Sequence, residues 1–119
     1  MSNITVRWAD HAQNTLVWEF PRHYTVDDIY SAGSQSADLL RIHPHEVDLV
    51  LSMAQGGISK GNLLANLPRQ TQRLVVVSKS MSARLLVESL GQSGLDTVQV
   101  HNLNEAYHYL SQQSTAAVD

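Results

Sequence analysis

A glycine-containing segment follows the most apolar strand pattern of this 119-residue chain, and it carries a serine and a lysine. The strand pattern spans residues 47–52, and the segment after it includes Gly56, Gly57, Ile58, Ser59 and Lys60. A helix that starts after such a loop leaves backbone N–H groups without intrahelical partners, and these groups can bind an anion or a partner. The chemistry open to the segment is therefore binding, and the Ser59 hydroxyl is of a type that kinases phosphorylate.

A second strand-to-helix junction has a similar character. Ser78, Lys79 and Ser80 follow the strand pattern of residues 73–77. If both strands belong to one parallel sheet, the two junctions open at the same edge, where ligands of such sheets bind. The two lysines of the chain, Lys60 and Lys79, both lie in these junctions. Polar residues also collect in loops merely because water solvates them, so both interpretations stay open.

Composition excludes several function classes. The chain has no cysteine, which rules out disulfides, thiolate metal sites and cysteine nucleophiles. Eight basic against eleven acidic residues give a net charge of −3, and without a basic cluster we expect no binding to nucleic acid. His43 and His45 are the one close pair of histidines, and we interpret them as a turn rather than a zinc site. We therefore predict neither a metal nor a cofactor.

Catalysis has little support in the sequence. No histidine or carboxylate adjoins the serines of the two junctions, and the order of the glycines matches neither a P-loop nor a dinucleotide-binding fingerprint. No apolar run approaches the roughly 20 residues of a transmembrane helix, and the first residues lack the features of a signal peptide. We expect a soluble cytoplasmic protein that is not an enzyme and does not bind a membrane.

Hydrophobic periodicity predicts the elements that must position these junctions. Residues 4–8 and 16–20 alternate apolar and polar side chains on either side of a polar turn, which indicates an antiparallel hairpin. Two capping boxes, Thr25 with Asp28 and Asn102 with Glu105, mark helix starts. The remaining patterns predict helices at 26–41, 59–67, 81–90 and from 103, and strands at 47–51, 73–77 and 97–100.

The first of these helices is expected to present one apolar face, made of Val26, Ile29, Tyr30, Gly33, Ala37 and Leu40. Its run of small residues either packs closely against the sheet or, as we expect for the serines, lies on the solvated side. The strands at 47–51 and 73–77 are near-continuous aliphatic runs, as expected for strands that helices cover on both faces or that lie centrally in the sheet. The chain is thus expected to be a single α/β domain over residues 1–113, with a mixed sheet and helices packed on it, followed by a flexible tail at 114–119.

This order of elements resembles the STAS family, named after sulfate transporters and anti-sigma factor antagonists. The likeness includes the hairpin, the long first helix, the strand that ends in a Gly/Ser loop, and the closing strand and helix start of residues 98–106. The chain looks most like the small stand-alone bacterial members related to the sporulation anti-anti-sigma factor. The resemblance implies a STAS-like fold and a non-catalytic regulatory module whose partner is an anti-sigma factor or a kinase-like regulator.

The resemblance also implies a role for Ser59. Switching members of the family are phosphorylated on a serine at the start of the second helix, within an Asp-Ser-Ser-Gly type sequence. Ser59 stands at the corresponding place, but the acidic residue and the second serine are missing and Lys60 follows directly. Ser59 is thus either a phosphorylation site or an ordinary helix N-cap.

Protein association through the loop of residues 53–61 is accordingly the function that we expect. The alternative is a small-anion or nucleotide-binding domain that uses the same loop together with residues 78–82. A homodimer that pairs through an exposed edge strand of the hairpin is a further expectation.

Overall fold

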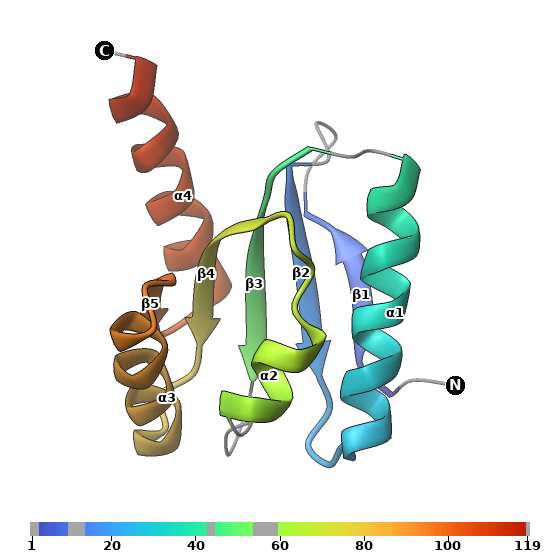
Figure 1. The fold of residues 1–119 in the computed structure, drawn as a ribbon. Helices are drawn as coiled ribbons and strands as arrows, with labels where there is room; N and C mark the ends of the chain where they lie inside the picture. The colour runs from blue at the N-terminus through green and yellow to red at the C-terminus, as the bar shows by residue number, and fades with distance from the viewer. Residues whose placement is uncertain (1–2, 10–13, 43–44, 54–59, 119) are drawn as a thin grey trace.

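The computed structural model describes residues 3–9, 14–42, 45–53 and 60–118, with side chains of residues 60 and 112–118 left aside. These residues form a compact α/β fold of five strands and four helices (Figure 1). The strands are β1 (Thr5–Trp8), β2 (Thr15–Phe20), β3 (Val47–Met53), β4 (Thr71–Val77) and β5 (Asp96–Val100). The helices are α1 (Val26–Ile42), α2 (Lys60–Asn66), α3 (Met81–Gln92) and α4 (Leu103–Val118). The predicted order of elements is confirmed.

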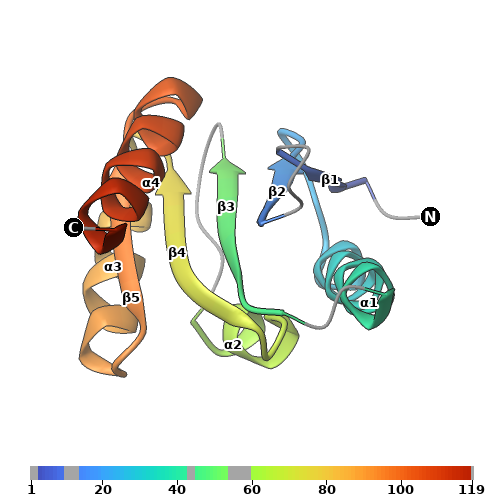
Figure 2. The ribbon, with the colours of Figure 1, turned by 90° about the horizontal axis from the view of Figure 1, so that it is seen from above.

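The strands lie in the sheet in the same order as in the chain, β1-β2-β3-β4-β5. β1 pairs with β2 antiparallel, as the alternating pattern predicts, and the other pairings are parallel. Each parallel connection moves one strand along the sheet in the same direction. Because such crossovers are right-handed, they place their helices on the same face. α1, α2 and α3 therefore cover one face, and α4 lies on the opposite face (Figure 2).

The face covered by α1, α2 and α3 holds the larger core, and we call it the three-helix face. Trp18 of β2 is fully buried there, and its Nε1 donates a hydrogen bond to Ser36 Oγ over 2.8 Å. Ser36 Oγ in turn donates to the carbonyl oxygen of Ala32 over 2.9 Å. The core on this face comprises Ile4, Leu16, Trp18, Phe20, Ile29, Ala32, Leu40, Val47, Leu49, Leu51, Met53, Leu63, Leu74, Val76, Ala83, Leu86 and Leu90.

The face covered by α4 holds a smaller core, and we call it the α4 face. Its buried members are Val17, Val50, Val75, Val77, Ala106 and Leu110. β3 and β4 contribute to both cores, which explains why their sequences are near-continuous aliphatic runs. The prediction that helices cover these strands on both faces is confirmed.

The inward stripe of α1 differs from the predicted one. The periodicity predicted that Val26 and Tyr30 face inward, but these side chains are 57% and 69% exposed. The buried positions include Ala32 and Ser36, although the serines of this helix were expected on the solvated side. The reason is that the Trp18 indole N–H needs a buried acceptor, and Ser36 supplies it.

Gly33 explains part of the run of small residues in α1. A Cβ at Gly33 would lie 2.6 Å from the backbone carbonyl oxygen of Asn66 at the end of α2. The small residue therefore allows close packing, but against α2 and not against the sheet.

The first capping box is confirmed in both of its hydrogen bonds, and the second in the bond from the helix backbone to the capping side chain. Asp28 N donates to Thr25 Oγ1 over 3.3 Å, and Thr25 N donates to Asp28 Oδ2 over 2.9 Å. At the start of α4, Glu105 N donates to Asn102 Oδ1 over 2.9 Å.

Element ends differ from the predictions by one to a few residues, and α4 differs most. It continues to Val118, so the segment predicted as a tail from residue 114 is helical up to that point. The prediction underrated Ala116 and Ala117, which favour helix and allow the preceding helix to propagate. No helix within the described part of the chain is both long and apolar enough to cross a membrane.

Candidate functional site

The carboxyl ends of β3, β4 and β5 lie at one edge of the sheet, because these strands are parallel and in register. Ser78, Lys79 and Ser80 follow β4 at this edge, and His101 and Asn102 follow β5. The edge is therefore where the structure brings polar residues of distant segments together.

The predicted loop after β3 is tested only in part. Gly56, Gly57, Ile58 and Ser59 lie outside the described residues, so the predicted phosphorylation site and loop contacts stay predictions. Lys60 is the first residue of α2, as expected for a helix that begins near Ser59, and nothing is described of its side chain.

The turn after β4 is held by a network of hydrogen bonds. Ser80 is the N-cap of α3, where its Oγ accepts from Ala83 N over 3.1 Å. Ser78 is buried, and its Oγ accepts from Ser80 N over 3.2 Å and donates to Ser80 Oγ over 3.1 Å. The backbone N–H of Ser78 donates to the carbonyl oxygen of Val100 over 3.0 Å. The two serines therefore shape the turn.

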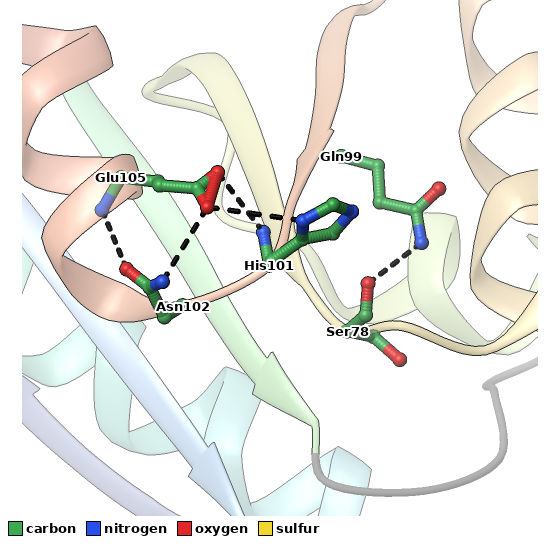
Figure 3. Close-up of polar contacts among 5 residues, drawn as sticks. All are labelled: Ser78, Gln99, His101, Asn102 and Glu105. Atoms are coloured by element: carbon green, nitrogen blue, oxygen red, sulfur yellow. Dashed lines mark hydrogen bonds and ion pairs between the residues drawn. The ribbon is translucent and has the colours of Figure 1, made fainter.

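The side chain of Gln99, in the neighbouring strand β5, forms hydrogen bonds to the backbone of this turn. Its Nε2 donates to the carbonyl oxygen of Ser78 over 2.7 Å (Figure 3). The same Nε2 donates to the carbonyl oxygen of Ser80 over 3.4 Å. Lys79 stands between these two anchored residues, with its side chain exposed. Its backbone position is thus fixed by contacts on both sides.

His101 faces the same turn. Its Nδ1 lies 3.8 Å from Glu105 Oε1, and its backbone N–H donates to Glu105 Oε2 over 3.5 Å. Glu105 also accepts from Asn102 Nδ2 over 3.4 Å. Figure 3 shows the imidazole between Glu105 on one side and the segment of Ser78 and Gln99 on the other. The carboxylate in the helix cap of α4 therefore lies beside the imidazole.

Two hollows open at this edge and share Lys79 and His101. The first has a volume of about 350 Å³, and we call it the basic hollow; it is lined by Lys79, Ser80, Met81, Arg84, Gln99 and His101. The second, of about 310 Å³, is lined by Glu19, Phe20, Ser52, Met53, Val77, Ser78, Lys79 and His101. Three of the six described residues around the basic hollow are basic and none is acidic, which suits an anion.

Sequence reasoning found part of this hollow. The sequence pattern pointed to Ser80 and Lys79 but not to His101. It missed Arg84 and Gln99 altogether. His101 lies directly before the capping box of Asn102 and Glu105, and a residue at that position lies at the carboxyl edge of the sheet. This position was the sequence signal that could have identified His101 as a site residue.

In the described part of the chain, no arrangement of side chains suits metal binding or catalysis by a serine hydroxyl. Within it, no three histidine, aspartate or glutamate side chains come together in a way that could hold a metal ion. Both serines of the turn are engaged in its hydrogen bonds. What the described side chains offer at this edge is positive charge and hydrogen-bond donors.

Exposed apolar side chains lie beside the basic hollow. Met81 and Leu85 of α3, one helical turn apart, are 65% and 59% exposed, and Met81 also lines the hollow. Leu64 of α2 is 41% exposed on the same layer of helices. The carboxyl edge thus joins a basic hollow to an apolar strip, which we call the α3 strip and define as Met81 and Leu85.

A larger hollow of about 560 Å³ lies between α1 and the end of α2. Tyr30, Gly33, Ser34, Ala37 and Arg41 line it from α1, and residues 65–70 line it from the other side. It is remote in sequence from the predicted junctions, and none of the predicted site residues lines it.

Comparison with models of protein families, with curated proteins and with solved structures gave no match. The assignment of an α/β fold therefore comes from the structure alone. The resemblance to STAS proteins stays a prediction.

Proposed function

We propose that this domain is a non-catalytic binding module that associates with another protein at the carboxyl edge of its sheet. The observation that carries this proposal is the α3 strip, where two large apolar side chains are more than half exposed next to a hydrogen-bonded turn. The predicted contact loop of residues 53–61 begins at the same edge, because it follows β3.

Such a surface has the make-up of a protein contact. Interfaces have an apolar centre with a polar rim, and methionine adapts its shape to a partner. Here Met81 and Leu85 provide the apolar part, and Lys79 with Ser80 provides polar groups beside it. The rigid turn keeps these groups in place, which lowers the entropic cost of binding.

The resemblance to STAS proteins supports a regulatory role in a bacterial cytoplasm. By that resemblance the partner is an anti-sigma factor or a kinase-like regulator, and phosphorylation of Ser59 would add about −1.5 to −2 charges to the predicted contact loop. The added charge changes the affinity for the partner without any catalysis by this chain.

Parallel pull-downs from a lysate of the source organism test the proposal. The baits are the tagged wild type, Leu85→Asp, Val26→Asp as matched control, and Ser59→Asp. Val26 is 57% exposed on α1, so the control places the same charge on a similarly exposed apolar residue elsewhere. We expect a partner that the wild type and Val26→Asp retain and that Leu85→Asp loses.

Equal retention by Leu85→Asp and the wild type would show that the α3 strip is not the contact. Loss with Ser59→Asp alone would support a phosphorylation switch in the loop. Light scattering of the purified wild type measures self-association, which the edge strands β1 and β5 would allow.

The basic hollow favours a second candidate function, the binding of a small anion. The predicted version used the loops after β3 and β4. The described residues support a related site between the loop after β4, α3 and the residue after β5.

A further inference from the structure

We propose that the basic hollow binds a dianion of the phosphate type, held by Lys79, Arg84 and His101. This inference rests on the second candidate function and names its ligand and its residues. Leu85 distinguishes it from protein association through the α3 strip, because Met81 lines the hollow but Leu85 is not among its lining residues.

The three basic side chains come from three different segments. Lys79 stands on the turn after β4, Arg84 lies in α3, and His101 follows β5. They line one hollow of about 350 Å³. Convergence of this kind does not follow from the local sequence, because Arg84 and His101 are separated by a whole helix–strand unit.

The backbone that carries these groups is ordered by hydrogen bonds. Gln99 Nε2 donates to the carbonyl oxygens on both sides of Lys79, and Ser80 caps the helix that carries Arg84. Glu105 lies beside the imidazole of His101, with its Oε1 3.8 Å from Nδ1 (Figure 3). An ordered turn loses less freedom when an anion binds than a mobile loop would.

Lys79 and Arg84 bring positive charge to the lining of the hollow, although the chain carries −3 overall. None of the six described lining residues is acidic. Arg84 and His101 do have acidic neighbours, Glu88 at 3.6 Å and Glu105 at 3.8 Å, but these are exposed pairs. Exposed ion pairs contribute little, so a dianion can share or displace them.

Two features suit an oxyanion of the phosphate type. The planar guanidinium of Arg84 can donate two parallel hydrogen bonds to a tetrahedral oxyanion, and lysine and imidazole donors would approach from other directions. α3 has twelve residues and no acidic residue in its first turn, so the positive end of its dipole adds to the same field.

The test uses the full-length protein labelled with ¹⁵N and inorganic phosphate as the probe. Amide resonances are followed while phosphate replaces chloride at constant pH and ionic strength. We expect saturable shifts that are confined to residues 79–85 and 99–102. Lys79→Gln and Arg84→Gln should each weaken binding by about threefold or more, as expected for loss of one partly exposed charge.

Arg69→Gln is the matched control, because Arg69 is an exposed arginine that lines the other hollow. It removes the same charge from the chain, and phosphate binding should stay as in the wild type. Shifts that do not saturate, that spread over the whole surface, or that weaken equally with Arg69→Gln would overturn the proposal.

Titrations with phosphoserine and with AMP, against serine and adenosine, then distinguish the source of the phosphate group. Shifts with both phosphates and with neither control assign recognition to the phosphate itself. Shifts with adenosine as well as AMP would overturn the proposal in favour of a nucleoside site. Loss of phosphate binding without loss of a protein partner in the pull-down would separate this site from the proposed protein contact.

Discussion

The two faces of the sheet differ in what covers them and in how polar their interiors are. On the three-helix face, Trp18 and Ser36 form a side-chain hydrogen bond inside an otherwise apolar core. On the α4 face, a valine cluster adjoins a bidentate ion pair, in which Arg73 Nε and Nη2 lie 2.8 and 2.6 Å from the two carboxylate oxygens of Asp48. Three crossover helices cover the three-helix face. Within the described part of the chain, α4 alone covers the other face.

This difference follows from the order of the strands. Three successive right-handed connections in one direction leave no crossover helix for the second face. That face therefore needs α4, and the strands also carry polar pairs on it. Arg7 and Glu19 form such a pair at 2.6 Å, with both side chains about 40% exposed (40% and 43%). Hydrogen bonds from Arg7 to Glu19 and to Tyr107 raise the pKa of this guanidinium above its ordinary value.

Truncation of the central side chain on the three-helix face should give the largest effect. Trp18→Ala removes a fully buried indole and leaves Ser36 without this donor. We expect a loss of unfolding free energy near the upper end of about 3–5 kcal/mol, measured by urea denaturation. Trp18→Phe keeps most of the apolar volume and should lose less. Equal losses for the two variants would mean that the hydrogen bond, and not the packing, dominates.

Removal of one partner of the ion pair tests the α4 face. The Asp48 and Arg73 side chains are 6% and 16% exposed, and the hydrogen bond to Asp48 raises the pKa of Arg73. Asp48→Ala leaves the guanidinium poorly solvated, so we expect a loss of about 3 kcal/mol. Asp48→Leu combined with Arg73→Met should recover much of that loss. A double variant as unstable as the single one would contradict the view that the unpaired charge causes the damage.

The packing of α1 on α2 tests the three-helix face more finely. Gly33→Ala would place a Cβ 2.6 Å from a backbone oxygen, so the helices must separate, at a cost of about 1–3 kcal/mol. Gly91→Ala is the matched control, because a Cβ there meets nothing within 4 Å. In α3 it should stabilise the protein by about 0.5–1 kcal/mol through helix propensity. Thermal denaturation of both variants measures the difference, and a neutral Gly33→Ala would mean that α2 shifts easily.

The smallest effect on stability is expected at Asp28, whose carboxylate accepts hydrogen bonds at the rim of the three-helix face. Hydrogen bonds from the backbone of Thr25 and Asn3 lower the pKa of Asp28 below its ordinary value. The carboxylate therefore adds stability that is present above its unfolded pKa of about 3.9 and is lost as the pH falls through the lower folded value.

Asp28→Asn should thus be less stable than the wild type at neutral pH, and the two should converge in acid. Urea midpoints across this range measure the effect, with Asp27→Asn, an exposed neighbour, as control. A difference that stays constant with pH would assign the role of Asp28 to shape rather than charge.

The fold was predictable where a local pattern has one interpretation. Alternation in residues 4–8 and 16–20 predicted the hairpin, and the two capping boxes predicted the starts of α1 and α4. The inward stripe of α1 was wrong because hydrophobicity alone favours Val26 and Tyr30. Burial of Ser36 is decided by a hydrogen bond to Trp18, which lies on another element.

The sequence predicted some of the residues of the candidate site and missed others. The serines and the lysine after β4 were found because a junction between strand and helix is a local signal. Arg84, Gln99 and His101 were not, because their joint position depends on the pairing of β4 with β5 and on the packing of α3.

By itself the sequence determined the order of the elements, the hairpin and the helix starts, since periodicity and capping act over a few residues. Only the tertiary structure decided which face each helix covers, which buried polar groups meet, and that three basic side chains line one hollow. Those outcomes depend on strand order and handed crossovers, which bring together residues that the chain keeps far apart.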